Sequence, residues 1–143
     1  MKRVLVLLIA LLLFAASGCG VLPDGDVSNA QIDYGHSALY SKEDMDAAIR
    51  LIEKEFRTWK GFELYSIAFV SDEKCGEENV AWLNSLEDAN DAETHFTQCI
   101  VFESAFHTAK NDEGFEEDAD YTHWQWWLGR SDGGEWKLMT WGY

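Results

Sequence analysis

Apolar side chains recur at helical spacing between residues 42 and 59. The stripe runs at intervals of four, three, four and three residues and consists of Met45, Ile49, Ile52, Phe56 and Trp59. This spacing places the whole stripe on one face of an α-helix. Ser41 stands at the N-cap position with Asp44 three residues later, which predicts a weak capping box. Gly61 lies just beyond the stripe, where a left-handed residue often ends a helix.

Four later segments alternate between apolar and polar positions, as β-strands do. They cover residues 62–71, 95–108, 121–129 and 135–142. Strict alternation in the first places Leu64 on one face and Ile67 and Phe69 on the other. A weaker apolar pattern predicts a short helix over residues 78–87. The run Ser-Asp-Gly-Gly at 131–134 predicts a hairpin between the last two strands.

The order of these elements predicts the fold class. One helix followed by strands joined by short connections indicates an α+β domain. We expect an N-terminal helix packed on a curved four-stranded antiparallel sheet, with the short second helix between the first two strands.

The beginning of the chain has the features of a secretory signal peptide. Two basic residues precede an unbroken apolar run over residues 4–14, and small residues lead to Cys19. This order predicts a signal peptide over residues 1–18. The sequence Ala-Ser-Gly-Cys is similar to a bacterial lipobox, although Ala16 stands where Leu is usual. Lipidation of Cys19 would anchor the protein to the outer face of the cytoplasmic membrane. An ordinary cleaved signal with a free Cys19 is the alternative.

Residues 19–40 are rich in turn-forming residues and show no periodicity, which predicts a lipid-anchored flexible linker. Residues 41–143 then form a single domain. Removing residues 1–18 takes away two basic side chains and moves the formal net charge from −15 to −17. So acidic a chain repels phosphate backbones, which excludes nucleic acid as a partner.

Parts of the domain resemble a family of small lipoproteins of gut Firmicutes. The resemblance rests on Tyr-Ser-Lys-Glu-Asp-Met-Asp-Ala-Ala at 40–48, Tyr-Thr-His-Trp-Gln-Trp-Trp-Leu at 121–128, and Gly-Glu-Trp-Lys at 134–137 with Gly-Tyr at 142–143. It covers about residues 40–143 and implies a Gram-positive source. The layout is similar to cystatin-like domains of the nuclear transport factor 2 type. The resemblance implies no activity and transfers no site residue.

Polar side chains that could carry chemistry gather on two of the predicted strands. Glu103 and His107 share a face of one strand, about 13 Å apart at roughly 3.3 Å per residue, and His123 on a neighbouring strand could approach either. A small enzyme with a polar pocket between sheet and helix is therefore one hypothesis. No catalytic motif surrounds these residues, and we assign none of them a catalytic role.

Three tryptophans lie on both faces of the strand over residues 121–129. Trp124 and Trp126 share one face, and Trp127 takes the other. Exposed indoles can stack on sugar rings or on a partner, whereas buried ones would form a thick two-sided core. With Glu103 and the two histidines, these tryptophans are our candidate binding residues.

Cysteines and carboxylates provide the remaining candidates. Cys75 and Cys99 could form a disulfide outside the cytoplasm. Six carboxylates between residues 112 and 120 could bind calcium weakly, but they lack the ligand spacing of a specific site. We therefore expect no metal centre and no cofactor.

The sequence thus favours a non-catalytic extracytoplasmic binding module whose ligand is a small molecule, a glycan or a protein. The enzyme hypothesis remains the alternative. An accessory domain that serves a partner protein is a third possibility.

Overall fold

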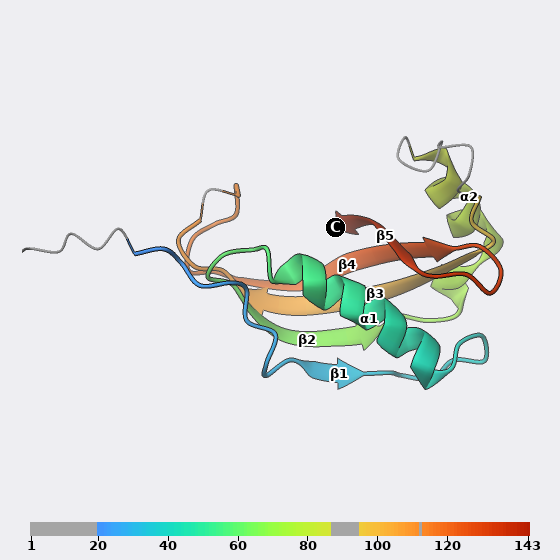
Figure 1. Cartoon of the computed structure of the whole chain (residues 1–143), viewed down its shortest axis with the longest axis horizontal. Coiled ribbons are helices and arrows are strands. Elements are labelled where there is room, and N and C mark those ends of the chain that lie inside the picture. Colours follow the sequence, from blue (N-terminus) through green and yellow to red (C-terminus); the bar gives the residue numbers. More distant parts are fainter. Residues whose placement is uncertain (1–19, 87–94, 112) are drawn as a thin grey trace, which may run out of the picture.

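The structure is a computed structural model that describes residues 20–86, 95–111 and 113–143. Its elements in chain order are β1 (Gln31–Asp33), α1 (Lys42–Phe56), β2 (Glu63–Phe69), the 3₁₀ turn η1 (Glu73–Cys75), α2 (Glu77–Ser85), β3 (Gln98–His107), β4 (Asp120–Arg130) and β5 (Lys137–Gly142). The fold is α+β, and the strands form one sheet in sequence order (Figure 1). The predicted signal peptide and Cys19 lie outside the described residues. No helix in the described ranges is long and apolar enough to cross a bilayer.

The sheet has five strands and is mixed, so the prediction of four antiparallel strands was wrong. β1 pairs in parallel with β2, and the other neighbours pair antiparallel. The helix α1 connects β1 to β2, as a parallel pair requires. β1 also precedes α1, so the helix is not the first element. The sequence gives little sign of β1 because its three residues include only one apolar side chain, Ile32.

Much of the segment expected to be a linker packs onto the domain. The backbone N–H of Gly25 donates to the carbonyl of Arg57 over 3.1 Å, and the N–H of Gly61 donates to the carbonyl of Pro23 over 2.8 Å. Asp26 exchanges backbone hydrogen bonds with the start of β2. The first of these contacts satisfies a carbonyl that the end of α1 leaves unpaired. Residues 23–33 therefore belong to the fold, which corrects the prediction of a linker over residues 19–40.

The helix α1 forms for the reasons that its sequence indicates. The Ser41 hydroxyl accepts from the backbone N–H of Asp44, and the Asp44 carboxylate accepts from the backbone N–H of Ser41. The predicted capping box is therefore confirmed. The whole predicted apolar stripe is buried. Gly61 has a φ of +77°, as expected of a residue that reverses the chain after a helix.

A β-bulge changes which side chains of β2 face the core. The register with β3 shifts between Leu64 and Ser66. The extra residue breaks the period of two, and Leu64, Ile67 and Phe69 are all buried in the main core. Strict alternation had placed Leu64 opposite the other two. The single-face pattern is possible only because Tyr65 occupies the bulge.

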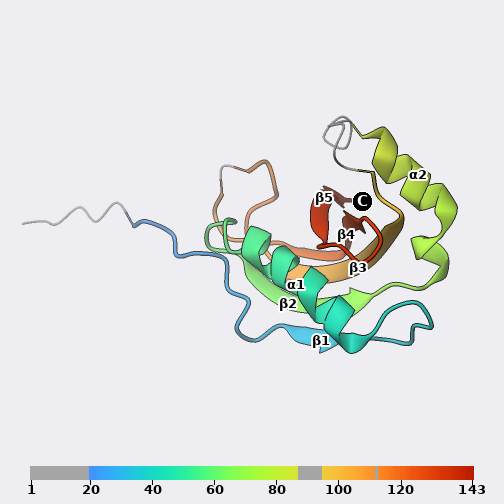
Figure 2. The same cartoon turned by 45° about the vertical axis from the view of Figure 1, so that its right-hand side comes forward.

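The two helices contact opposite faces of the sheet. The Phe56 ring of α1 packs 5.7 Å from that of Phe106, whereas the Trp82 ring of α2 packs 4.9 Å from that of Trp127. Because side chains alternate along β3 and β4, we name these the α1 face and the α2 face. Figure 2 shows α1 lying across the sheet and α2 to one side of it, near the start of β3.

Arg130 joins the β4–β5 hairpin to the beginning of α1. Its guanidinium donates to Asp44 over 2.8 Å and to Gln98 over 2.7 Å, and it lies 4.2 Å from the centre of the Trp136 ring. The Trp136 indole N–H donates to the Asp44 carbonyl over 3.0 Å. A planar cation between a carboxylate and an indole fixes the hairpin in one orientation.

Candidate functional site

Glu103 and His123 meet on the α2 face of the sheet. The Nδ1 atom of His123 lies 3.1 Å from a Glu103 oxygen, and the Gln125 amide donates to the other oxygen over 3.3 Å. His123 has a φ of +57°, and its side chain is 79% exposed. An imidazole so open to water is not held in one geometry. The cluster is a surface hydrogen-bond network and lacks the enclosure of an active site.

His107 belongs to a different cluster. Its two ring nitrogens lie 2.8 Å from Asp120 and 3.0 Å from Asp118, and its ring stacks on Tyr65 at a centroid distance of 6.4 Å. The hydrogen bond to Asp120 raises the pKa of His107 above its ordinary value, and the bond to Asp118 adds to the effect. His107 thus fastens the loop between β3 and β4, which we call the acidic loop, to the end of β3.

The structure does not bring Glu103, His107 and His123 into a pocket between sheet and helix. All three lie on strands or at a strand end, away from the α1 face. The space between the sheet and α1 is filled by apolar side chains of the core. These residues therefore offer no shared site where a substrate could be held by all three.

Trp126 is a core residue and is not available to a ligand. It is fully buried on the α1 face, and its ring stacks on Trp59 with centroids 5.2 Å apart. Its indole N–H donates to the Ser104 hydroxyl over 2.9 Å. One member of the predicted binding set is thus removed, because the interior satisfies both its apolar surface and its polar atom.

Trp124 lies at the centre of a partly exposed group of rings on the α1 face. Trp141 is 39% exposed and Tyr143 is 81% exposed. We call this group the aromatic surface; its members are Phe115, Tyr121, Trp124, Trp141 and Tyr143. The rings of Phe115, Tyr121 and Tyr143 all lie within 6.2 Å of Trp124, mostly edge to face. Trp141 joins the group through Trp126 and Trp59, with ring centroids 5.8 and 6.2 Å away.

The indole N–H of Trp124 has no hydrogen-bond partner among the described residues, although it is closed off from solvent. A buried donor without an acceptor costs roughly 1–3 kcal/mol.

Trp127 lies on the α2 face and is only half-buried. Trp82 packs against it edge to face, and the Lys74 ammonium lies 5.9 Å from its ring centre. The three tryptophans singled out from the sequence therefore have three different environments. Trp141 and Tyr143 were not singled out, because their importance depends on strands that pair far apart in the chain.

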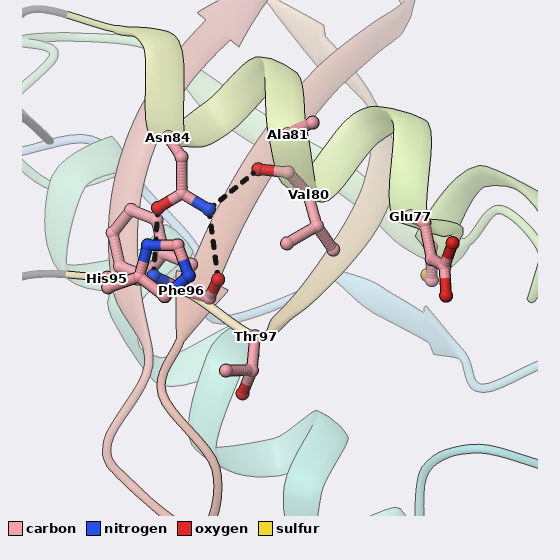
Figure 3. Close-up of a pocket in the computed structure, with 8 residues that line it drawn as sticks. Glu77, Val80, Ala81, Asn84, His95, Phe96 and Thr97 are labelled. Carbon is pink, nitrogen blue, oxygen red and sulfur yellow. Dashed lines mark hydrogen bonds between the residues drawn. The ribbon is translucent and has the colours of Figure 1, made fainter.

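A cavity of about 360 Å³ lies between α2 and the start of β3 (Figure 3). Asn84 joins α2 to the segment just before β3. Its amide N–H groups donate to the carbonyls of Val80 and Phe96, and its oxygen accepts from the Phe96 backbone N–H. Glu77 and His95 stand at the exposed rim, and Cys75 lies at the buried side. All polar groups of Asn84 are used within the protein, so none is left for a ligand.

Within residues 20–86, 95–111 and 113–143, no three metal-ligating side chains stand close enough together to hold a metal ion. Comparisons of the chain with protein-family models, with curated proteins and with solved structures gave no significant match. The functional argument therefore rests on the residues and their geometry.

Proposed function

We propose that this protein is a non-catalytic binding module that is lipid-anchored through Cys19 outside the cytoplasm. In this proposal residues 1–18 are removed as a signal peptide. The aromatic surface binds a neutral glycan. The observation that carries the proposal is the group of partly exposed rings around Trp124, supported from behind by buried Trp59 and Trp126.

The rigidity of the surface supports binding by stacking. Trp59 contacts Trp126, Trp124 and Trp141 with ring centroids 5.2–6.2 Å apart. Rings held in this way lose little conformational freedom when a ligand stacks on them. The flat apolar face of a sugar ring fits such indoles, and each good aromatic contact contributes about 0.5–1.5 kcal/mol beyond the buried area.

Charge and hydrogen bonding favour a neutral sugar over an anionic ligand. The formal net charge of −15 disfavours anions. Glu113, Glu116 and Glu117 flank Phe115 on the adjacent loop and are exposed, so they offer acceptors for sugar hydroxyls.

The cystatin-like layout remains part of the proposal. It is supported by α1 packing on one face of the antiparallel strands β2–β5 and by α2 standing between β2 and β3. The edge strand β1 is an addition to that layout.

Glycan binding is tested by calorimetry with soluble neutral oligosaccharides, using cello-, xylo- and chito-oligomers. We expect Trp141→Ala to raise the Kd about tenfold, since one stacking contact contributes about 1.4 kcal/mol at the upper end of its range. Trp82→Ala is the matched control, because Trp82 is 40% exposed against 39% for Trp141 but lies on the other face. Equal loss in both variants, or no binding by any oligomer, contradicts the proposal.

The membrane anchor is tested separately by fractionating a Gram-positive host that expresses the full chain. We expect Cys19→Ser to release the protein from the membrane fraction and to remove the lipid mass from its N-terminus. Cys75→Ser is the control and should stay with the membrane. Retention of the Cys19→Ser protein would show that another segment holds it there.

A further inference from the structure

Cys75 and Cys99 come from different elements and lie together under η1 and α2. Cys75 is the last residue of η1, and Cys99 is the second residue of β3. The Cys99 Sγ atom lies 3.7 Å from the carbonyl oxygen of Lys74, the residue before Cys75. The Cys75 Sγ atom in turn lies 3.3 Å from the carbonyl oxygen of Ser71, to which its thiol donates. The sequence spacing alone could not show this proximity, which depends on η1 folding back onto β3.

Both cysteines are free thiols and both are buried. The neighbouring Cys75 side chain lowers the pKa of Cys99, whereas the neighbouring Cys99 side chain and burial raise the pKa of Cys75. The thiolate, which is the form that reacts with disulfides, is therefore favoured at Cys99.

The cavity beside α2 gives oxidants a route to this pair. Cys75 forms part of its wall, and the exposed rim residues Glu77 and His95 leave it open to solvent. Cys99 lies behind Cys75 and is fully buried. An oxidant that enters the cavity therefore approaches the pair from the side of Cys75.

We propose that Cys75 and Cys99 form an intramolecular disulfide that fastens η1 and α2 to β3. The oxidant is a disulfide, such as oxidised glutathione or the disulfide of a protein oxidant. Both cysteine S–H bonds break, one S–S bond forms between the cysteines, and the oxidant's S–S bond breaks. The oxidant takes up the two electrons and two protons and leaves as two thiols.

The cross-link closes a loop of 25 residues, from position 75 to position 99. Constraining a loop of this length in the unfolded chain raises stability in the chain-entropy model. The native fold already places the Cys99 sulfur against the backbone next to Cys75, so forming the bond requires little rearrangement of η1 or β3. We expect the oxidised protein to melt about 10 °C above the reduced protein.

The experiment uses the full chain carrying Cys19→Ser, so that only the two buried cysteines remain. The protein is incubated with oxidised glutathione, denatured, alkylated and examined by intact mass and by a non-reducing peptide map. We expect a mass loss of about 2 Da from two hydrogens, no alkylation, and one peptide linking Cys75 to Cys99. Adding Cys75→Ser or Cys99→Ser should abolish all three signals.

The outcome is decided on the protein that carries Cys19→Ser alone. The test therefore does not depend on the folding of the Cys75→Ser or Cys99→Ser variant. Two alkylated cysteines after oxidation would overturn the proposal. A stable mixed disulfide with glutathione, or a link between two chains, would overturn it as well. None of these results bears on glycan binding, because the aromatic surface lies on the other face of the sheet.

Discussion

Replacing Gly25 by Ala should detach the N-terminal segment from the domain. A Cβ atom at this position would lie 2.1 Å from the carbonyl oxygen of Phe56 and 2.9 Å from that of Trp59. Both oxygens belong to backbone at the end of α1, so neither can rotate away. Ordinary contact needs more than 3 Å, and the segment must therefore move by about an ångström or leave its site.

The magnitude follows from the contacts that such a movement would break. Four backbone hydrogen bonds hold residues 23–26: Gly25 to Arg57, Gly61 to Pro23, Asp26 to Phe62 and Leu64 to Asp26. Each contributes about 1 kcal/mol net, so complete release costs about 4 kcal/mol. Overpacking without release costs about 1–3 kcal/mol. We therefore expect a loss of about 2–4 kcal/mol, or a Tm lower by roughly 5–15 °C.

Thermal unfolding followed by circular dichroism measures this loss. Gly20→Ala is the matched control, because a Cβ there meets nothing within 4 Å. Limited proteolysis gives an independent readout, since a released segment around β1 should be cut before the rest of the domain. If Gly25→Ala and Gly20→Ala melt within 2 °C of one another and are cut at the same rate, the docking of this segment is refuted.

Two further predictions concern polar contacts. Ser104→Ala should destabilise the protein by about 1–3 kcal/mol in urea unfolding, because the buried Trp126 N–H loses its acceptor; adding Trp126→Phe should restore part of that loss only if the hydrogen bond is its cause. The NMR titration of His107 should have a midpoint above 6.5, and Asp120→Asn should lower it. The stabilisation that accompanies a raised folded-state pKa is fully present below pH 6.5, and it is lost as the pH rises through the folded-state pKa. The stability difference between the native protein and His107→Asn should therefore be larger at pH 6 than at pH 8.5, and equal values would refute the ion pairs.

Periodicity predicts the elements of this protein because their apolar stripes are long. The helix over Lys42–Phe56 and the four longer strands each repeat their pattern over six or more residues. β1 has three residues and only one apolar side chain, so no periodic signal exists to detect. The bulge in β2 is hidden for a different reason. Alternation assumes a constant period of two, and the extra residue at Tyr65 is specified by pairing with β3, which is remote in sequence.

The candidate site shows the same division between local pattern and remote packing. Alternation correctly places Trp126 and Trp127 on opposite faces, but it cannot show which rings remain open. That depends on the length of α1. Its 15 residues extend about 23 Å at 1.5 Å per residue, whereas the 11 residues of β4 extend about 37 Å at 3.4 Å per residue.

A helix shorter than the strands it covers leaves one end of the α1 face without a cover. α1 ends at Phe56, and Trp59 fills only the space next to it. Beyond this point Trp124 packs on Tyr143 and on Phe115 of the acidic loop, whereas Trp141 packs on Trp126. The exposed aromatic surface is thus a consequence of where the helix stops. Residues that end the helix, rather than the tryptophans themselves, determine that these rings remain exposed.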